Sequence, residues 1–400
     1  MKVLTIHNYY QQFGGEDQIF QTENHLLESR GHTVYRYTIH NDQIRDTHPL
    51  TLASNTLWNS KIYQELKQVM REFKPDVAHF HNTFPIISPS AYYAAKAEGV
   101  PVVQTLHNYR LLCPNGLFFR DGKVCEDCVQ QLIPLSSIIH NCYRNSRTET
   151  LGVATMLTLH SFLRTWLDNI EVFIAYSQFA LDKFVEGGLP ANKFMFKTNF
   201  LHPDPGIGAG KGGYALFVGR LSVEKGLGVL LNAWERLNHP IPLKVVGDGP
   251  MAHLVRDVAE RVPDIEWLGR KSLLEVYELM GNASFLVFPS EWYETFGRVA
   301  IEAFACGTPV IAADIGAITE LVTPYKTGLH FKASDAQDLA AKVEWAIAHP
   351  QELTQMRHNA RTEFEAKYTA DDNYQRLTEI YQAAITKGQI RQGLLNQQIV

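Results

Sequence analysis

Short apolar runs, rich in valine and isoleucine, recur along the first half of the chain, and a polar turn follows each of them. Such runs are typical of parallel strands that are buried on both faces. We expect strands at Val3–Ile6, Val34–Ile39, Val77–Phe80, Val102–Leu106 and Val172–Ala175. Between them, apolar residues recur at helical spacing over about Asp17–Ser29, Trp58–Phe73, Pro89–Glu98 and Gln178–Glu186. This alternation predicts a doubly wound α/β domain.

The pattern stops near residue 203, at the proline- and glycine-rich segment HPDPGIGAGKGG. Its part Gly208–Gly213 matches the dinucleotide-binding pattern G-x-G-x-x-G. That pattern should follow a strand and open a helix, whereas this copy precedes a strand. We therefore predict a flexible interdomain linker here.

A second alternating series follows the linker. Its predicted strands are Ala215–Val218, Leu243–Val246, Ile265–Leu268, Phe285–Phe288 and Val310–Ala313, and its helices start near Val223, Pro250, Ser272, Phe296 and Ala336. A last helix is expected over about Ala370–Thr386, where Tyr374, Leu377 and Tyr381 recur at helical spacing. The polar tail from Gly388 is predicted to be loose.

The bulk properties narrow the class of protein. The length of 400 residues suits two or three domains. A net charge of −5 argues against nucleic-acid binding by the protein as a whole, and a local basic patch is the alternative. No apolar run reaches the roughly 18 residues of a spanning helix, and the start MKVLTIHNYY enters a strand directly. We therefore expect a cytoplasmic protein, with peripheral contact to the inner face of the membrane as a further option.

The stretch 284–321 contains the densest candidate chemistry. A buried strand ends at Pro289, the acids Glu291 and Glu294 follow in the turn, and a helix begins after Phe296-Gly297. Open α/β sheets bind ligands outside the carboxyl ends of their strands, and free N–H groups at a helix start suit a phosphate. The alternative is an ordinary βαβ unit with solvated carboxylates.

Glu294 and Glu302 are separated by seven residues, and the segment FGRVAIEAFACGTPVIAADIGAITELV follows Glu294 and contains Glu302. In these features the chain resembles the retaining GT-B glycosyltransferases of glycosyltransferase family 4, over nearly its whole length. The resemblance implies two doubly wound, Rossmann-like domains that face a central cleft. Residues 1–203 would form the acceptor-side domain, with a cysteine-rich insertion at about 108–145. Residues 204–369 would bind the nucleotide-sugar, and residues 370–400 would cross back as a helix with a loose tail.

Two loops match the family's diphosphate-binding elements. Gly14-Gly15 stands at the first strand-to-helix turn, where bare backbone N–H groups can face a pyrophosphate or a sugar. Arg220 and Lys225 follow the first strand of the second series and match the family's diphosphate-binding Arg and Lys. With two cations on the diphosphate no divalent ion is needed, and the chain contains no Asp-x-Asp. The alternatives are a routine turn and a solvated surface pair.

Further roles follow from the resemblance. Gly247 and Gly249 lie in a loop of the expected base and ribose pocket, although plain turns also use glycine. His107 matches the family's strand-end histidine that reaches the donor sugar, while His79 and His81 are second choices with structural or acceptor-side roles. Glu294 would hold sugar hydroxyls, Glu302 the ribose hydroxyls, and the N–H groups near Phe296 and Gly297 the sugar or phosphate.

The implied reaction is retaining, metal-independent transfer from a nucleoside-diphosphate sugar to a hydroxyl acceptor. No covalent nucleophile is nominated, and catalysis would rest on positioning and on stabilising the departing diphosphate. UDP is the default base, and the acceptor would be a glycan, a lipid-linked or a small molecule. The alternatives are a GT-B epimerase, a phosphorylase, which would bring a cofactor lysine and a longer chain, or a non-catalytic nucleotide-sugar-binding scaffold.

Four of the five cysteines cluster in the insertion, and Cys306 stands alone in a core helix. The four are Cys113, Cys125, Cys128 and Cys142, spaced C-x11-C-x2-C-x13-C. In a cytosolic chain this spacing favours a structural zinc, and the alternatives are free thiols or a redox-sensitive disulfide. After the cluster, the amphipathic stretch Leu151–Trp166 is predicted to be a core helix that covers the first sheet, with contact to a membrane or a lipid-linked acceptor as the alternative.

Overall fold

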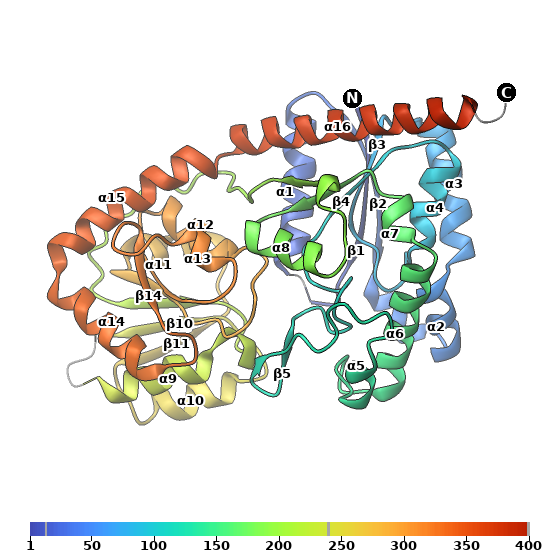
Figure 1. Cartoon of the computed structure of the whole chain (residues 1–400). Coiled ribbons are helices and arrows are strands. Elements are labelled where there is room, and N and C mark those ends of the chain that lie inside the picture. Colours follow the sequence, from blue (N-terminus) through green and yellow to red (C-terminus); the bar gives the residue numbers. More distant parts are fainter. Residues whose placement is uncertain (13, 238–240, 398–400) are drawn as a thin grey trace. The chain divides into compact units, whose positions relative to one another are not determined.

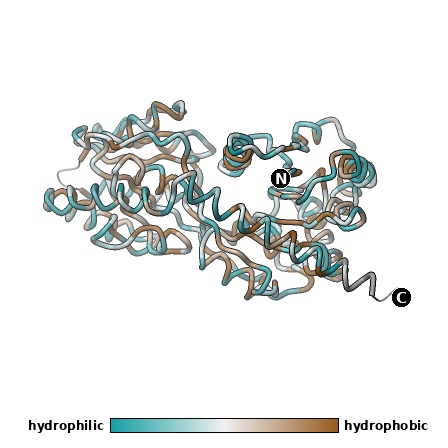
Figure 2. Tube along the Cα trace, turned by 90° about the horizontal axis from the view of Figure 1, so that it is seen from above, coloured by the Kyte–Doolittle hydropathy of each residue, from teal (hydrophilic) through white to brown (hydrophobic). Residues whose placement is uncertain are grey.

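The computed structural model describes residues 1–12, 14–237 and 241–397, without the side chains of residues 46, 392 and 394–397. The chain divides into two compact units (Figure 1). The first contains residues 1–117, 126–197 and 373–400, and the second contains residues 118–125 and 198–372. Hydrophobic stretches alternate with polar ones along the trace of both units, as the sequence pattern requires (Figure 2).

The first unit is built on a parallel sheet with the strand order β2-β1-β3-β4-β7-β8. Its strands are β1 (Lys2–Tyr9), β2 (Thr33–His40), β3 (Val77–Asn82), β4 (Val102–Thr105), β7 (Val172–Ala175) and β8 (Phe194–Phe196). Its helices before the last one are α1 (Gly15–Ser29), α2 (Pro49–Leu57), α3 (Ser60–Phe73), α4 (Ser90–Ala97), α5 (Leu135–Ile139), α6 (Arg147–Phe162), α7 (Thr165–Asp168) and α8 (Gln178–Glu186). The helix predicted from Trp58 begins later because Asn59 caps α3 by accepting a bond from the Ile62 N–H.

The second unit has a parallel sheet of order β11-β10-β9-β12-β13-β14. Its strands are β9 (Ala215–Val218), β10 (Leu243–Val246), β11 (Ile265–Gly269), β12 (Phe285–Phe288), β13 (Val310–Ala313) and β14 (Gly328–Phe331). Its helices are α9 (Leu227–Arg236), α10 (Ala252–Ala259), α11 (Leu273–Asn282), α12 (Arg298–Ala305), α13 (Ile318–Leu321), α14 (Ala336–Ala348) and α15 (Pro350–Lys367). A hairpin of β5 (Phe119–Arg120) and β6 (Lys123–Val124), from the cysteine-rich insertion, also belongs to this unit.

All the strands predicted from the sequence are present, and the predicted doubly wound, parallel α/β class is confirmed. The sequence pattern missed the sheet strands β8 and β14, the β5–β6 hairpin, and the helices α2, α5, α13 and α15. Strand β8 has only three residues, and α15 has so few apolar positions that only three of its residues are buried, namely Met356, Ala360 and Phe364. Both β8 and α15 depend on neighbours that supply the missing burial.

The last helix, α16 (Ala370–Gln397), lies along the first unit from Asn373 onward (Figure 1). Leu377, Ile380, Tyr381 and Ala384 are buried in one cluster with Val3, Val77, Val103 and Val172 of the sheet. The Tyr381 hydroxyl also bonds the His79 Nδ1 at 2.8 Å. The prediction of a loose tail from Gly388 is wrong, because the helix continues to Gln397.

The segment 204–213, predicted to be a flexible linker, is instead held against the second unit. The N–H groups of Gly208, Gly210 and Gly212 donate to backbone carbonyls of Cys306, Gly281 and Asn282. A Cβ on Gly208 would lie 2.1 Å from the Gly281 Cα, so this contact requires glycine. The prediction of a flexible linker is therefore wrong for this segment, and its glycines serve close backbone packing.

We expect Leu377→Ala to destabilise the first unit by about 3 kcal/mol, because it leaves a cavity where α16 meets the sheet. A lowered melting temperature in differential scanning calorimetry would measure this loss. The matched control is Gln382→Ala on the exposed side of the same helix, where the change should be close to neutral. Equal melting temperatures for the two variants would contradict the anchoring of α16 by this cluster.

Candidate functional site

In the second unit the strand order reverses between β9 and β12. The chain runs outward from β9 through β10 to β11, and then returns to β12 on the other side of β9. The loops that follow β9 and β12 therefore diverge from neighbouring strand ends, and such a switch point is where open α/β sheets bind ligands. Arg220 and Lys225 lie in the first of these loops, and Glu294 lies in the second.

The Glu294 carboxylate joins the two loops. Its Oε1 accepts from the Lys225 ammonium at 2.5 Å, the Ser290 hydroxyl at 2.9 Å and the Trp292 indole N–H at 3.0 Å. The Lys225 ammonium also lies 5.2 Å from the centre of the Trp292 ring. Glu294 is buried, so this charge is matched by a cation and by donors rather than by bulk water.

Gly226 allows the two loops to approach. Its φ of +69° lies in the left-handed region, and a Cβ there would lie 1.7 Å from the Pro289 carbonyl oxygen. The Glu291 N–H donates to the Glu224 carbonyl at 2.9 Å, which fastens the loops beside this contact. A glycine next to Lys225 is thus a condition for the contact between Lys225 and Glu294.

Arg220 differs from Lys225 in its surroundings. Its side chain is exposed, and among the described residues no carboxylate lies within ion-pair distance of it. Because Lys225 is already paired with Glu294, Arg220 is the cation of this loop that is open to an incoming anion.

Gly247 and Gly249 have a packing role in the structure. Gly247 has φ +137°, and a Cβ there would lie 1.8 Å from the Gly219 carbonyl oxygen; one on Gly249 would lie 2.5 Å from the Leu221 carbonyl oxygen. These glycines let the β10 loop lie against the β9 loop that contains Arg220. They therefore support the shape of the site, whether or not a ligand touches them.

Glu294 and Glu302, the two acids that match the family's motif, have different hydrogen-bond partners in the structure. Glu302 is buried on α12 and accepts from the Arg298 Nε at 3.0 Å, whereas the described bonds of Glu294 go to the loops. Burial raises the pKa of the Glu302 carboxyl, and the Arg298 charge opposes this rise. Phe296 is buried, and Gly297, with φ +103°, stands directly before α12.

In the first unit, Gly14 and Gly15 begin α1. The Gly14 N–H donates to the Asp17 Oδ2 at 2.8 Å, and Asp17 Oδ1 lies 2.7 Å from the His7 Nε2. Neither glycine has a positive φ, and a Cβ on Gly15 would meet no described atom within 4 Å. Packing among the described residues therefore does not require glycine here, in contrast to Gly226 and Gly247.

His107 follows β4 and lies in a row of histidines. Its Nε2 is 3.1 Å from the His81 Nδ1, and its Nδ1 is 3.5 Å from the Tyr176 hydroxyl. Burial holds the pKa of His107 and of His81 well below the usual range, and the neighbouring histidines add to this. Both rings are therefore neutral near pH 7. In their contact one ring nitrogen donates a hydrogen bond and the nitrogen of the other ring accepts it.

His79 has a structural role. Its two ring nitrogens are bonded to the Tyr381 hydroxyl at 2.8 Å and the Thr105 hydroxyl at 2.7 Å. Burial lowers its pKa to about 3, so the ring stays neutral. The prediction of a structural His79 agrees with these contacts, which join α16 to the sheet.

The sequence analysis missed a buried ion pair between Lys197 and Glu23 beneath the histidines. The Glu23 Oε2 lies 3.7 Å from the His81 Nε2, so the pair touches the histidine row. In the described part of the chain, Glu23, His79 and His81 are the one group of three whose ligand atoms gather closely enough for a metal. Lys197 already supplies the positive charge, and His79 uses both nitrogens, so these residues do not fit a metal site. Glu23 stands at a helix position whose neighbours at helical spacing are apolar, and this is the signal that could have identified it.

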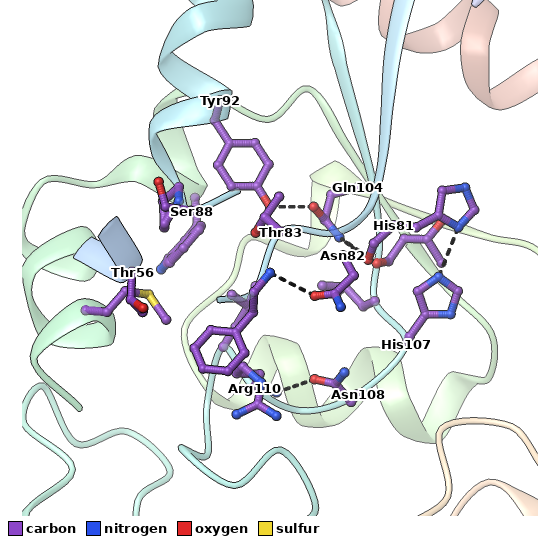
Figure 3. Close-up of a pocket in the computed structure, with 17 residues that line it drawn as sticks. Thr56, His81, Asn82, Thr83, Ser88, Tyr92, Gln104, His107, Asn108 and Arg110 are labelled. Atoms are coloured by element: carbon purple, nitrogen blue, oxygen red, sulfur yellow. Dashed lines mark hydrogen bonds between the residues drawn. The ribbon is translucent and has the colours of Figure 1, made fainter. Parts of the chain in front are cut away.

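A pocket of about 60 Å³ opens beside His107 and is bordered by β3, β4 and α6 (Figure 3). Among its lining residues are His81, Asn82, Gln104, His107 and Asn108. At about 10–15 Å³ for each water, it has room for roughly four to six water molecules. It can take a hydroxyl or a hydroxymethyl group, surrounded by amides and neutral imidazoles.

Glu16 lies beside the glycine pair, in the first turn of α1. The Asn108 amide lies 3.4 Å from its Oε2. Burial, together with the charge of Asp17, raises its pKa to about 8, although Arg110, Asn108 and Tyr10 favour the ionised form. Sequence reasoning had no signal for this carboxyl, because its burial depends on the loop after β4.

All five cysteines have unbridged thiols. Cys113, Cys128 and Cys142 belong to the first unit, and Cys125 belongs to the second. The Cys113 thiol lies 3.0 Å from the Asn115 Oδ1. Cys306 is buried, as expected for a packing residue, and burial raises the pKa of its thiol to about 12.

Two Rossmann-like parallel sheets, each in its own unit, are the architecture of the GT-B fold. Two family models match the chain: Glycosyltransferase Family 4 at residues 14–196, and Glycosyl transferases group 1 at residues 206–363. The chain therefore belongs to the glycosyltransferase family that these models describe.

Curated relatives agree with this assignment. The chain is 30% identical to a glycogen synthase of Mycobacterium tuberculosis, over 78% of this chain and 70% of that protein. It is 32% identical to an uncharacterized glycosyltransferase of Methanocaldococcus jannaschii, over 42% of this chain and 48% of that protein. The chain thus spans about half the length of some of the curated relatives it matches.

A solved structure shares the fold. The crystal structure of Anabaena HepE in complex with UDP-glucose aligns with a TM-score of 0.67 at 19% identity, covering 95% of this chain and 99% of that one. No helix among the described residues combines the length and the apolar character needed to cross a bilayer.

We expect Lys225→Met to lower the melting temperature by several degrees, at about 2–4 °C for each kcal/mol, because it leaves the Glu294 carboxylate buried without its cation. Glu294→Gln in the same chain should recover part of that loss, since a neutral amide needs no counterion. Thermal melts of the two single variants and the double variant measure this coupling. Strictly additive losses would contradict the ion pair at the switch point.

Glu16 should make stability depend on pH. The unfolded chain ionises this carboxyl near its ordinary pKa of 4.5, whereas the folded protein keeps the proton up to about pH 8. Stability is therefore lost as the pH rises through this window. We expect Glu16→Gln to raise the melting temperature more at pH 8 than at pH 5. Glu72→Gln, at an exposed position of α3, is the control and should show no such trend.

Proposed function

We propose that the protein transfers a sugar, with retention of configuration, from a nucleoside-diphosphate sugar to a hydroxyl acceptor. The observation that supports this most directly is the loop after β9, which presents Arg220 and Lys225 at the switch point of a parallel sheet. Family membership supports a transferase, and the UDP-glucose complex of the Anabaena neighbour supports a UDP-sugar as donor.

In this proposal the diphosphate binds the exposed Arg220 guanidinium, and Lys225 adds a second positive charge nearby. Both stabilise the charge that grows on the leaving group as the sugar departs, which is where a preorganised cation lowers the barrier most. Two cations make a divalent ion unnecessary at the diphosphate, in line with the absence of Asp-x-Asp from the sequence.

Glu294 is proposed to accept hydrogen bonds from sugar hydroxyls. A carboxylate fixed by Lys225, Ser290 and Trp292 has a set orientation and needs no rearrangement when the sugar arrives. Backbone N–H groups near Phe296 and Gly297 are assigned to the sugar or phosphate, and those near Gly14 and Gly15 to the same ligand groups.

His107 is proposed to bond a hydroxyl of the donor sugar. Its lowered pKa keeps the ring neutral, so it can offer one donor or one acceptor without adding charge to the site. Glu302 is assigned to the ribose hydroxyls. Its carboxylate also accepts a hydrogen bond from Arg298, so it would bind the ribose and Arg298 together. Gly247 and Gly249 are assigned to the base and ribose pocket.

A structural zinc at Cys113, Cys125, Cys128 and Cys142 stays a prediction. The thiols are unbridged, as a zinc site requires, but among the described residues no three of them lie within metal-ligand distance of one another, so zinc would have to draw them together. Elemental analysis of the purified protein, with a variant lacking two of the four cysteines, tests this assignment.

We expect Arg220→Ala and Lys225→Ala each to lower kcat/KM at least a hundredfold, because each removes a cation from the leaving group. They should also reduce the rise in melting temperature that UDP produces in the parent protein. The matched controls are Arg236→Ala and Lys211→Ala, at exposed positions of the same unit.

A thermal-shift comparison of UDP-, GDP- and ADP-sugars identifies the donor, and release of the free nucleoside diphosphate then measures transfer. Parent-like turnover in both Arg220→Ala and Lys225→Ala would contradict the proposed site. Donor binding without transfer to any acceptor would instead support a nucleotide-sugar-binding scaffold.

A further inference from the structure

Exposed apolar side chains concentrate in one short segment of the first unit. Of the 19 large hydrophobic residues exposed in the described chain, 8 fall between residues 132 and 163. Phe162 is 76% exposed and Ile139 is 63% exposed, so these are full side chains in solvent. We call the set the α5–α6 apolar face; it consists of Leu132, Ile133, Leu135, Ile139, Leu151, Leu159, Phe162 and Leu163.

The members lie on neighbouring elements. Helix α5 packs against α6 (Figure 1), and the Thr158 hydroxyl donates to the Leu132 carbonyl at 3.2 Å, which holds the loop before α5 beside the end of α6. On α6 itself, Leu151, Leu159 and Phe162 follow the same exposed side at helical spacing. The eight exposed residues therefore belong to two packed helices and the segments beside them, and are not scattered over the unit.

The other side of α6 is also apolar and is used within the unit. Val153, Met156 and Leu157 are buried, and Met156 lines the pocket beside His107. The predicted core helix is therefore correct for one side of α6 only. A helix that is apolar on both sides gains nothing from water on its outer side, so a second contact is expected there.

One cation that is unpaired among the described residues lies beside the face. Residues 126–168 contain three arginines (Arg144, Arg147 and Arg164) and four acids (Glu126, Asp127, Glu149 and Asp168), and most of these charges are paired. Glu149 lies 3.5 Å from Arg144, and Arg164 lies 3.4 Å from Asp168. Arg147 has no carboxylate partner among the described residues and is exposed next to the apolar side of α6.

We propose that the α5–α6 apolar face docks onto an anionic lipid surface, with its leucine, isoleucine and phenylalanine side chains among the acyl chains and Arg147 at the headgroups. Leucine and phenylalanine beside arginine are the composition of helices that lie in the membrane interface. A contact between protein copies would instead favour tyrosine, tryptophan and methionine, none of which belongs to this face. The pocket beside His107 lies behind the same helix, so docking would suit a lipid-linked acceptor, a consequence that rests on the proposed function.

Vesicle flotation tests the docking. The parent protein should float with vesicles of phosphatidylcholine and phosphatidylglycerol, and Leu159→Gln/Phe162→Gln should lower the bound fraction at least fivefold. The matched control is Leu273→Gln/Leu274→Gln, which removes two exposed leucines from α11 of the second unit and should bind as the parent does. Arg147→Glu should weaken binding to these vesicles more than binding to pure phosphatidylcholine.

A parent protein that stays in the soluble fraction would overturn the proposal, and so would equal flotation of the two double variants. Light scattering supplies a further check, because a dimer that Leu159→Gln/Phe162→Gln dissociates, without vesicle binding, would make the face an interface between copies. The rise in melting temperature with UDP should be the same in the parent and in this variant, which also shows that the variant folds. Loss of the UDP effect in the parent would count against the proposed function alone, and flotation would still decide the docking.

Discussion

The contact between Lys225 and Glu294 is the constraint on which the second unit's site depends. A lysine and a glutamate on two loops that diverge at a switch point would ordinarily be too far apart to pair, and water would solvate each of them. Here the left-handed glycine at 226 brings one loop onto the Pro289 carbonyl, and a buried carboxylate oxygen accepts three donors at once. The pair fixes the orientation of both loops before any ligand arrives, which is the condition for electrostatic preorganisation.

The first unit holds neutral polar groups where the second holds an ion pair. His79, His81 and His107 form a row on and after the central strands β3 and β4. Burial lowers the pKa of each, so these three rings are uncharged near pH 7. Lys197 and Glu23 form a buried ion pair that contacts this row at His81. The two units thus hold polar groups at strand ends in different ways: one with a fixed ion pair beside an open cation, the other with uncharged hydrogen-bonding rings.

The strands were predictable because each sheet is buried on both faces, which demands continuous valine- and isoleucine-rich runs at every central strand. The short edge strand β8 and the polar helix α15 were not, since their formation depends on neighbours rather than on their own pattern. Among the site residues, the loop cations and Glu294 were visible as charges directly after apolar runs. Glu16, Glu23 and Lys197 were not, because only the folded chain determines which charges lose their water.

Crowding separates two kinds of glycine that look alike in the sequence. At Gly226, Gly247 and Gly249 a side chain would collide with backbone atoms of a neighbouring loop, so packing alone explains the residue. At Gly15 no described atom lies within 4 Å of where a Cβ would stand. Its φ is not in the left-handed region, so other residues could adopt the same backbone conformation. The packing of the described residues therefore gives no reason for glycine at this position, at the start of a helix that follows a strand of the sheet. The same comparison applied to G-x-G-x-x-G at 208–213 gives the opposite result, because there the neighbouring backbone already fills the space.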